Sequence, residues 1–200
     1  MTVTRIEPLG KNRSRIYLDE RPAFVLYRGE ISRYEIREGF ELPEESYREI
    51  MEELLIKRAK LRCMNLLKSM DRTEFQLRQK LAMGDYPAEI IDQALAYVKG
   101  FGYVNDESYA ERYIELRRER DSRMQITHAL MQKGISKDVI QAIFEEQEPA
   151  DEEEMIRRWM EKKHFDPETA SAKEKQKMYM FLMRKGFSAS EISRAFHSEK

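Results

Sequence analysis

The start of the chain has a different pattern of apolar and polar positions from the rest. Short apolar runs separated by turn residues predict three strands, over Val3–Pro8, Arg15–Leu18 and Ala23–Tyr27. Three short strands predict a small β-meander, and so few strands do not make a core of their own. We therefore expect this meander to pack on the helix that follows it.

A long helix is predicted after Gly39 and Pro43. It opens with Glu44 and Glu45, whose negative charges favour the positive end of a helix. Its apolar positions recur at helical spacing, and these positions are Tyr47, Ile50, Met51, Leu54, Leu61 and Met64. This helix is expected to connect the meander to the remainder of the chain.

From about Lys57 onward the pattern is helical and it repeats. The segments that begin at Leu77, Ile126 and Met178 align with one another along their whole length. Their matching apolar positions are Leu81, Leu130 and Leu182, then Tyr86, Ile135 and Phe187, and finally Leu95, Phe144 and Phe196. Each segment reads as a helix, a tight turn and a second helix, preceded by a more variable helix.

The turns of the second and third repeats contain Gly134 and Gly186, where a helix ends in a left-handed residue. In the first repeat Asp85 stands at the aligned position and Gly84 precedes it. We therefore expect that turn to close one residue earlier, with Pro87 starting the next helix.

Capping residues and charge mark further boundaries. Serines stand at predicted helix starts, and they are Ser122, Ser136 and Ser188. The mostly acidic run Glu145–Glu154 is interrupted by Pro149 and predicts a joint between the second and third repeats. Its simpler interpretation is that Asp151 caps a helix whose first turn holds the following glutamates.

These patterns predict a mainly α fold: an elongated array of three three-helix repeats, with a small N-terminal β-meander and a long connecting helix. The expected segments are a β-rich element over 1–42, the long helix over 43–70, and repeats over 57–104, 105–149 and 150–200.

Composition agrees with a thin core. Among the 200 residues, 36% are charged and 41% hydrophobic, so the surface is large relative to the interior. The net charge of −1 gives no global field for nucleic acid. Cys63 is the single cysteine, which excludes an internal disulfide and suggests a buried thiol. Neither a signal peptide nor a membrane span is recognisable, so we expect a soluble, cytoplasmic protein.

No catalytic pattern interrupts the repeats. The glycines form no phosphate-binding loop, and the three histidines, His128, His164 and His197, are far apart and outside any metal-hydrolase motif. We therefore expect a binding protein that is not an enzyme and that uses no cofactor and no metal.

Basic residues gather in the second and third repeats and are the candidate binding residues. In the second repeat they are Arg112, Arg117, Arg118, Arg120, Arg123, Lys133 and Lys137, and in the third Arg157, Arg158, Lys162, Lys163, Arg184 and Lys185. They could engage phosphates or an acidic protein surface. Alternatively, the arginines complement a helix end and pair locally with Glu119 and Asp121. Both interpretations stay open for the second repeat.

Aromatic residues accompany these cations. Trp159 lies in the basic third repeat, and tryptophan is enriched at binding hot spots, but a single one in a thin repeat is favoured as part of the core. Tyr109 and Tyr113 are one helical turn apart and are likewise expected to pack.

The runs GYVNDESYAERYIELRRER, ALMQKGIS and FLMRKGFSASEI closely resemble the RecX family of bacterial recombination regulators. The resemblance extends from about Ala59 to Phe196. Asp85 departs from the family pattern at a turn glycine, and Ser122 stands where the family commonly has glycine.

The resemblance implies a non-catalytic protein that binds RecA and its filament on DNA. It further implies modulation, mostly inhibition, of ATP hydrolysis and strand exchange in homologous recombination, DNA repair and the SOS response. We expect a monomer with at most weak contact with single- or double-stranded DNA and none with membranes. The alternatives are a direct DNA-binding protein of helix-turn-helix type and a general helical adaptor.

Overall fold

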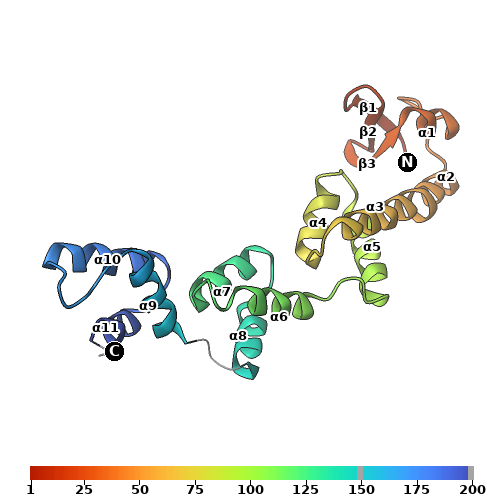
Figure 1. Ribbon diagram of the computed structural model, residues 1–200. Coiled ribbons are helices and arrows are strands. Elements are labelled where there is room, and N and C mark those ends of the chain that lie inside the picture. Colours follow the sequence, from red (N-terminus) through yellow and green to blue (C-terminus); the bar gives the residue numbers. More distant parts are fainter. Residues whose placement is uncertain (148–150, 198–200) are drawn as a thin grey trace. The chain divides into compact units, whose positions relative to one another are not determined.

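The computed structural model describes residues 1–147 and 151–197, in two compact units, Met1–Asn105 and Asp106–Lys200. The first unit contains a three-stranded sheet and helices, and the described residues of the second form helices joined by turns and loops (Figure 1). The predicted mainly α fold with a small N-terminal sheet is confirmed. Among the described residues no helix is both long and apolar enough to cross a membrane.

The N-terminal sheet is an antiparallel meander with the order β1-β2-β3. Its strands are β1 (Val3–Pro8), β2 (Arg13–Leu18) and β3 (Arg21–Tyr27). β2 and β3 therefore begin two residues earlier than the pattern predicts. Asp19 and Glu20 both have positive φ values, of 47° and 68°, as a tight hairpin turn requires.

A short helix, α1 (Arg28–Arg33), follows the sheet and was not predicted. Its six residues include Gly29 and are too few to show a helical period. The Glu30 carboxylate accepts a hydrogen bond from the Tyr27 backbone N–H at 2.7 Å, which stabilises the start of the helix. The β-rich region expected over 1–42 thus also contains a short helix.

The long helix is present but contains a π-helical segment. α2 (Glu44–Arg48), η1 (Glu49–Leu55) and α3 (Ile56–Ser69) follow one another with helical dihedrals at both junctions. The predicted apolar stripe is right at Ile50 and Met51 but wrong at Leu61, which is 57% exposed. A π-turn uses more residues than an α-turn, so the stripe shifts along the sequence. Beyond η1 the buried positions are Ile56, Ala59, Cys63 and Leu66.

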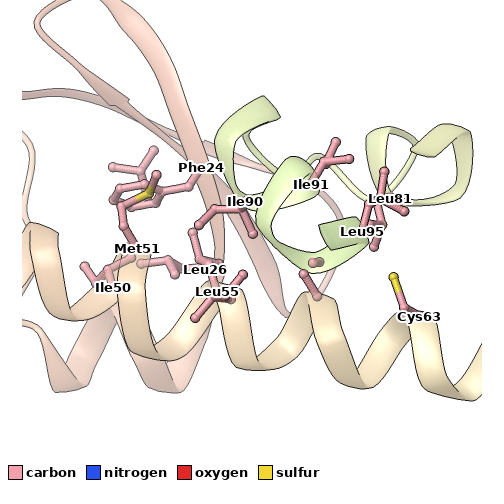
Figure 2. Close-up of a cluster of buried hydrophobic side chains, with 14 of the residues drawn as sticks. Phe24, Leu26, Ile50, Met51, Leu55, Cys63, Leu81, Ile90, Ile91 and Leu95 are labelled. Atoms are coloured by element: carbon pink, nitrogen blue, oxygen red, sulfur yellow. The ribbon is translucent and has the colours of Figure 1, made fainter. Parts of the chain in front are cut away.

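The core of the first unit joins the sheet to the helices. Figure 2 shows Phe24 and Leu26 of β3 facing the long helix, with side chains of α4 (Glu74–Ala82) and α5 (Ala88–Gly100) on its same side. The expected packing of the meander on the long helix is confirmed. Burial raises the pKa of the Cys63 thiol to about 11, so this thiol remains protonated and unreactive at neutral pH.

The second unit holds two further three-helix groups. They comprise α6 (Asp106–Arg117), α7 (Arg123–Gln132) and α8 (Lys137–Glu146), then α9 (Glu152–Lys162), α10 (Ala172–Arg184) and α11 (Ala189–His197). Aligned positions of the three repeats are buried alike, at Leu81, Leu130 and Leu182 and again at Ala94, Ile143 and Ala195. This shared core confirms the internal repeat.

The repeat turns follow the expected chemistry with one correction. Gly134 and Gly186 have φ values of 86° and 87°, in the left-handed region. The turn of the first repeat does not close early, because Asp85 itself adopts φ 59°. Aspartate tolerates this conformation better than most residues, and the Arg15 guanidinium holds its carboxylate at 2.7 Å.

The predicted helix caps are present. Ser122, Ser136 and Ser188 accept backbone hydrogen bonds from Gln125, Val139 and Glu191, respectively. Asp151 likewise accepts from Glu154, and glutamates occupy the first turn of α9. Residues 148–150 of the predicted acidic joint Glu145–Glu154 lie outside the described residues, so the joint itself stays a prediction.

Candidate partner-binding surfaces

The arginines at the end of α6 pair with their own neighbours. Arg117 lies 2.9 Å from the Asp121 carboxylate, and Arg118 lies 3.2 Å from Glu115. Arg120 donates a hydrogen bond to the Leu116 carbonyl at 3.0 Å, near the negative end of the helix. These arginines are therefore paired within their own helix end. Such exposed ion pairs contribute only about 0–1 kcal/mol each, so anionic groups of a partner can replace the local carboxylates.

A cation also lies over two stacked tyrosines in the second repeat. Tyr109 and Tyr113 lie on successive turns of α6, and the centroids of their stacked rings are 6.3 Å apart. Lys133 Nζ lies 5.8 Å and 5.6 Å from their centroids, and the Arg117 guanidinium lies 5.4 Å from the Tyr113 ring. Such cation–π contacts attract the positive charge to the faces of the rings and so favour one position for it.

The third repeat has a similar arrangement around its single tryptophan. The rings of Trp159 and Phe181 meet edge to face at 5.4 Å. Lys185 lies 4.6 Å and Lys162 lies 5.2 Å from the Trp159 ring, while Lys163 lies 5.3 Å from Phe181. Trp159 is half-buried against the core of the repeat, as predicted, and it also holds lysines.

These two arrangements occupy equivalent places in their repeats. Tyr113 precedes the buried Ile114 of α6, as Trp159 precedes the buried Met160 of α9. Lys133 and Lys185 each immediately precede a turn glycine, at the end of the middle helix. We call these two contacts the lysine–aromatic pairs. Sequence reasoning named both lysines but missed their pairing, because it depends on how the helices pack.

The remaining predicted residues do not join one surface. Arg157 and Arg158 both lie near the Glu154 carboxylate, at 3.6 Å and 3.4 Å. The Arg123 guanidinium lies 4.6 Å from the Phe144 ring. Arg112, Lys137 and Arg184 are exposed. The candidates therefore divide into locally paired arginines, cations that lie over aromatic rings, and other exposed cations.

Hydrogen bonds connect the second repeat to the third. Ser122 Oγ donates to the Lys185 carbonyl at 2.7 Å, and the Arg123 backbone N–H donates to Glu152 at 2.9 Å. A groove of about 730 Å³ lies beside these contacts. Burial raises the pKa of the Glu152 carboxyl, and the nearby Glu191 adds to the effect. The sequence presented Glu152 only as a favourable first-turn residue.

Basic and aromatic residues of the first unit were not singled out from the sequence. Arg13, Arg58, Arg62 and Lys80 line a cleft against the sheet. On α5 and just after it, Tyr97 and Phe101 lie 4.8 Å apart, and Phe101 is 63% exposed. No group of three histidine, cysteine or acidic side chains is positioned to bind a metal within residues 1–147 and 151–197.

The fold and these surfaces define a class: a protein of three helical repeats that presents cations, two of them held on aromatic rings at equivalent positions. Models of the first, second and third three-helix domains of RecX match residues 59–97, 105–142 and 151–196. The chain belongs to the RecX family.

Relatives match over nearly the whole chain. A protein of Caldanaerobacter subterraneus subsp. tengcongensis named regulatory protein RecX is 31% identical, over 98% of this chain and 99% of its own length. A Clostridium perfringens protein of the same name is 28% identical, over 94% of this chain and 90% of its own length. These names place the chain in a family of regulatory proteins.

Solved structures show the same fold. A crystal structure of regulatory protein RecX superposes with a TM-score of 0.68 at 25% identity, covering 99% of this chain and all of that one. RecX from Lactobacillus salivarius superposes with a TM-score of 0.62 at 22% identity, covering 70% of this chain and 94% of its own.

Proposed function

We propose that this protein is a non-catalytic regulator that binds RecA and the RecA filament on DNA. It modulates, and mostly inhibits, ATP hydrolysis and strand exchange during recombination and repair. The RecX resemblance supplies RecA as the partner, and the name regulatory protein, carried by the relatives, supports a role without catalysis. The proposal places a monomer in the cytoplasm.

The observation that best supports this proposal is the repetition of the lysine–aromatic pairs. Lys133 over Tyr113 and Lys185 over Trp159 offer the same chemistry in successive repeats. A filament likewise presents the same surface on successive subunits. Two weak, equivalent contacts on one chain reinforce each other, because the second binding event becomes intramolecular.

An ATPase titration tests the proposal. RecA, single-stranded DNA and ATP are mixed with rising amounts of the protein, and hydrolysis is expected to slow at substoichiometric ratios. Unchanged hydrolysis at equimolar protein contradicts the proposal.

A pair of variants tests the lysine–aromatic pairs. We expect Lys133→Ala/Lys185→Ala to weaken inhibition. The matched control is Lys173→Ala/Lys175→Ala, which removes two exposed lysines of α10 and is expected to inhibit as the wild type does. Equal inhibition by both variants would show that the lysine–aromatic pairs do not contribute to inhibition.

Direct DNA binding is the second candidate, favoured by the turns between α7 and α8 and between α10 and α11. Each joins two helices through a left-handed glycine, Gly134 or Gly186, the outline of a helix-turn-helix reader. A direct reader binds naked DNA with an affinity that falls steeply as salt rises. Strong, salt-sensitive binding to naked DNA without any effect on RecA would favour this candidate.

A further inference from the structure

A cleft of about 510 Å³ in the first unit gathers cations from three elements. Arg13 comes from β2, Arg58 and Arg62 from successive turns of α3, and Lys80 from α4. The cleft thus depends on the sheet and the first repeat packing together. It is separate from the lysine–aromatic pairs, which belong to the second unit.

Most of the positive charge in this cleft is unbalanced. Arg58 is paired with Glu30. Among the described residues, Arg13, Arg62 and Lys80 have no carboxylate within ion-pair distance. The cleft's own acid, Asp85, is held by Arg15 at 2.7 Å, so its charge is already compensated. Neighbouring cations without counter-charges create a positive potential that an incoming anion relieves.

Exposed apolar side chains share the cleft with these cations. Met83 is 76% exposed, Leu61 is 57% exposed and Tyr27 is 45% exposed. Tyrosine, methionine and arginine are the residue types enriched at protein interfaces, while lysine is depleted there. Methionine also adapts its shape to different partners. The lining therefore combines electrostatic attraction with apolar contact.

The aromatic rings are poorly placed for stacking on nucleic-acid bases. The Arg58 guanidinium lies 4.8 Å over the Tyr27 ring and covers one of its faces. Tyr86, the other aromatic residue lining the cleft, is half-buried and packs against the core. Binding of single strands relies on open aromatic platforms, whereas an acidic peptide needs only cations and apolar contacts.

We propose that this cleft docks an acidic segment of a protein partner, with apolar side chains interspersed among its carboxylates. Carboxylates would lie against Arg13, Arg62 and Lys80, and the apolar side chains against Leu61 and Met83. The proposal does not require that the partner be RecA, so its test contains no recombinase.

Fluorescence anisotropy with three labelled probes tests the cleft on the full chain. The first probe is a short peptide of glutamate and leucine, the second has glycine in place of leucine at the same charge, and the third is oligo(dT) of similar charge. The glutamate–leucine peptide is expected to bind more tightly than the glutamate–glycine peptide. No detectable binding of the first peptide at low salt would overturn the proposal.

Charge reversals locate the binding. Arg13→Glu/Arg62→Glu/Lys80→Glu is expected to weaken binding of the glutamate–leucine peptide at least about tenfold. The matched control, Arg21→Glu/Arg37→Glu/Lys57→Glu, reverses three exposed cations of the same unit outside the cleft and is expected to weaken binding less than about threefold, by the loss of net charge alone. Equal losses in both variants overturn the proposal. So does a cleft reversal that weakens only oligo(dT) binding.

Two milder changes keep the result interpretable if the reversals unfold the unit. Arg13→Gln/Arg62→Gln/Lys80→Gln removes charge without repulsion and is expected to weaken peptide binding in the same direction. Met83→Ala alters a largely exposed side chain. It is expected to weaken binding of the glutamate–leucine peptide and to leave binding of the glutamate–glycine peptide unchanged. Unchanged binding in both variants also contradicts the proposal.

Discussion

Ser122 Oγ donates a hydrogen bond to the backbone carbonyl of Lys185 at 2.7 Å, and this bond joins the second repeat to the third. The same oxygen caps α7 by accepting from the Gln125 backbone N–H. A Cβ built on the neighbouring Gly186 would lie 2.5 Å from Ser122 Oγ. With Ser122 in this position, residue 186 thus has no room for a Cβ atom.

Gly186→Ala is therefore expected to destabilise the second unit for two reasons. Its φ of 87° costs an alanine about 1–2 kcal/mol, and the clash with Ser122 adds to that cost. Gly102→Ala is the matched control, because Gly102 has a φ of 70° but open space around its Cβ position. Unfolding in urea is followed by the fluorescence of Trp159, the single tryptophan, for the first variant, and by far-UV circular dichroism for both.

A further substitution separates strain from clash. Ser122→Gly/Gly186→Ala is expected to restore part of the stability that Gly186→Ala loses, once the effect of Ser122→Gly alone has been subtracted. Strictly additive losses would show that the two residues do not interact as described. An equal effect of Gly102→Ala and Gly186→Ala would show that only backbone strain matters.

Asp85 combines a strained backbone with an ion pair. Asp85→Ala keeps φ 59° and loses the contact with Arg15, while Asp85→Gly loses the contact but relieves the strain. We therefore expect the alanine variant to be less stable than the glycine variant by about 1 kcal/mol. Urea unfolding monitored by circular dichroism measures the difference.

An Arg15→Ala background checks the ion pair itself. Both partners are about one-third exposed, so the pair is expected to contribute no more than about 1 kcal/mol. In that background, Asp85→Ala should cost less than it does in the wild type. An undiminished cost would assign the whole effect to the backbone.

The raised pKa of the Glu152 carboxyl predicts that the stability of the second unit depends on pH. Burial and the nearby Glu191 raise its pKa in the folded protein, while the Arg123 backbone N–H opposes the rise. A raised carboxyl pKa means that the folded state binds the proton more tightly than the unfolded state does. Its stabilising contribution is therefore fully present below the unfolded pKa of about 4.3 and is lost as pH rises through the folded value.

Glu152→Gln remains neutral at every pH and can still accept from Arg123. It is expected to stabilise the second unit at pH 7.5 and to have less effect at pH 4, as measured by urea unfolding followed through Trp159. Glu168→Gln, an exposed position, serves as the control. A Glu152→Gln effect that is the same at both pH values would contradict the assignment.

The sequence predicted those parts of the fold that depend on local chemistry. Turn residues located the three strands, and self-similarity located the aligned cores around Leu81, Leu130 and Leu182. The π-helical segment was missed because a search with a helical period assumes constant spacing, which fails at Leu61. Local periodicity does not encode such an insertion.

The sequence predicted which residue types form the candidate site but not how they are arranged. The sequence identified Lys133 and Lys185 as cations, but their positions over Tyr113 and Trp159 follow from packing between helices. The cation cleft was missed for the same reason, since Arg13 is distant in sequence from Arg62. Long-range proximity of charges is a tertiary property, whereas a cluster of arginines within one helix is visible at once.

Substitutions of the arginines at the end of α6 test whether these side chains bind the partner or only stabilise their own helix. Arg117→Glu/Arg118→Glu/Arg120→Glu is expected to weaken inhibition of the RecA ATPase if these side chains contact the filament. The reversal also places new negative charges near Asp121 and Glu115 and at the negative end of the helix. Because the pairs are largely exposed, we expect a loss of stability of no more than about 2–3 kcal/mol in total.

Arg117→Gln/Arg118→Gln/Arg120→Gln removes the same positive charges without adding repulsion. It is expected to weaken inhibition less than the reversal does, while its unfolding midpoint stays close to that of the wild type. Both quantities are measured on the same preparations, by ATPase titration and by urea unfolding. Full inhibition by the reversed variant would show that these arginines serve only their own helix, because a contact with an anionic partner does not survive three reversed charges.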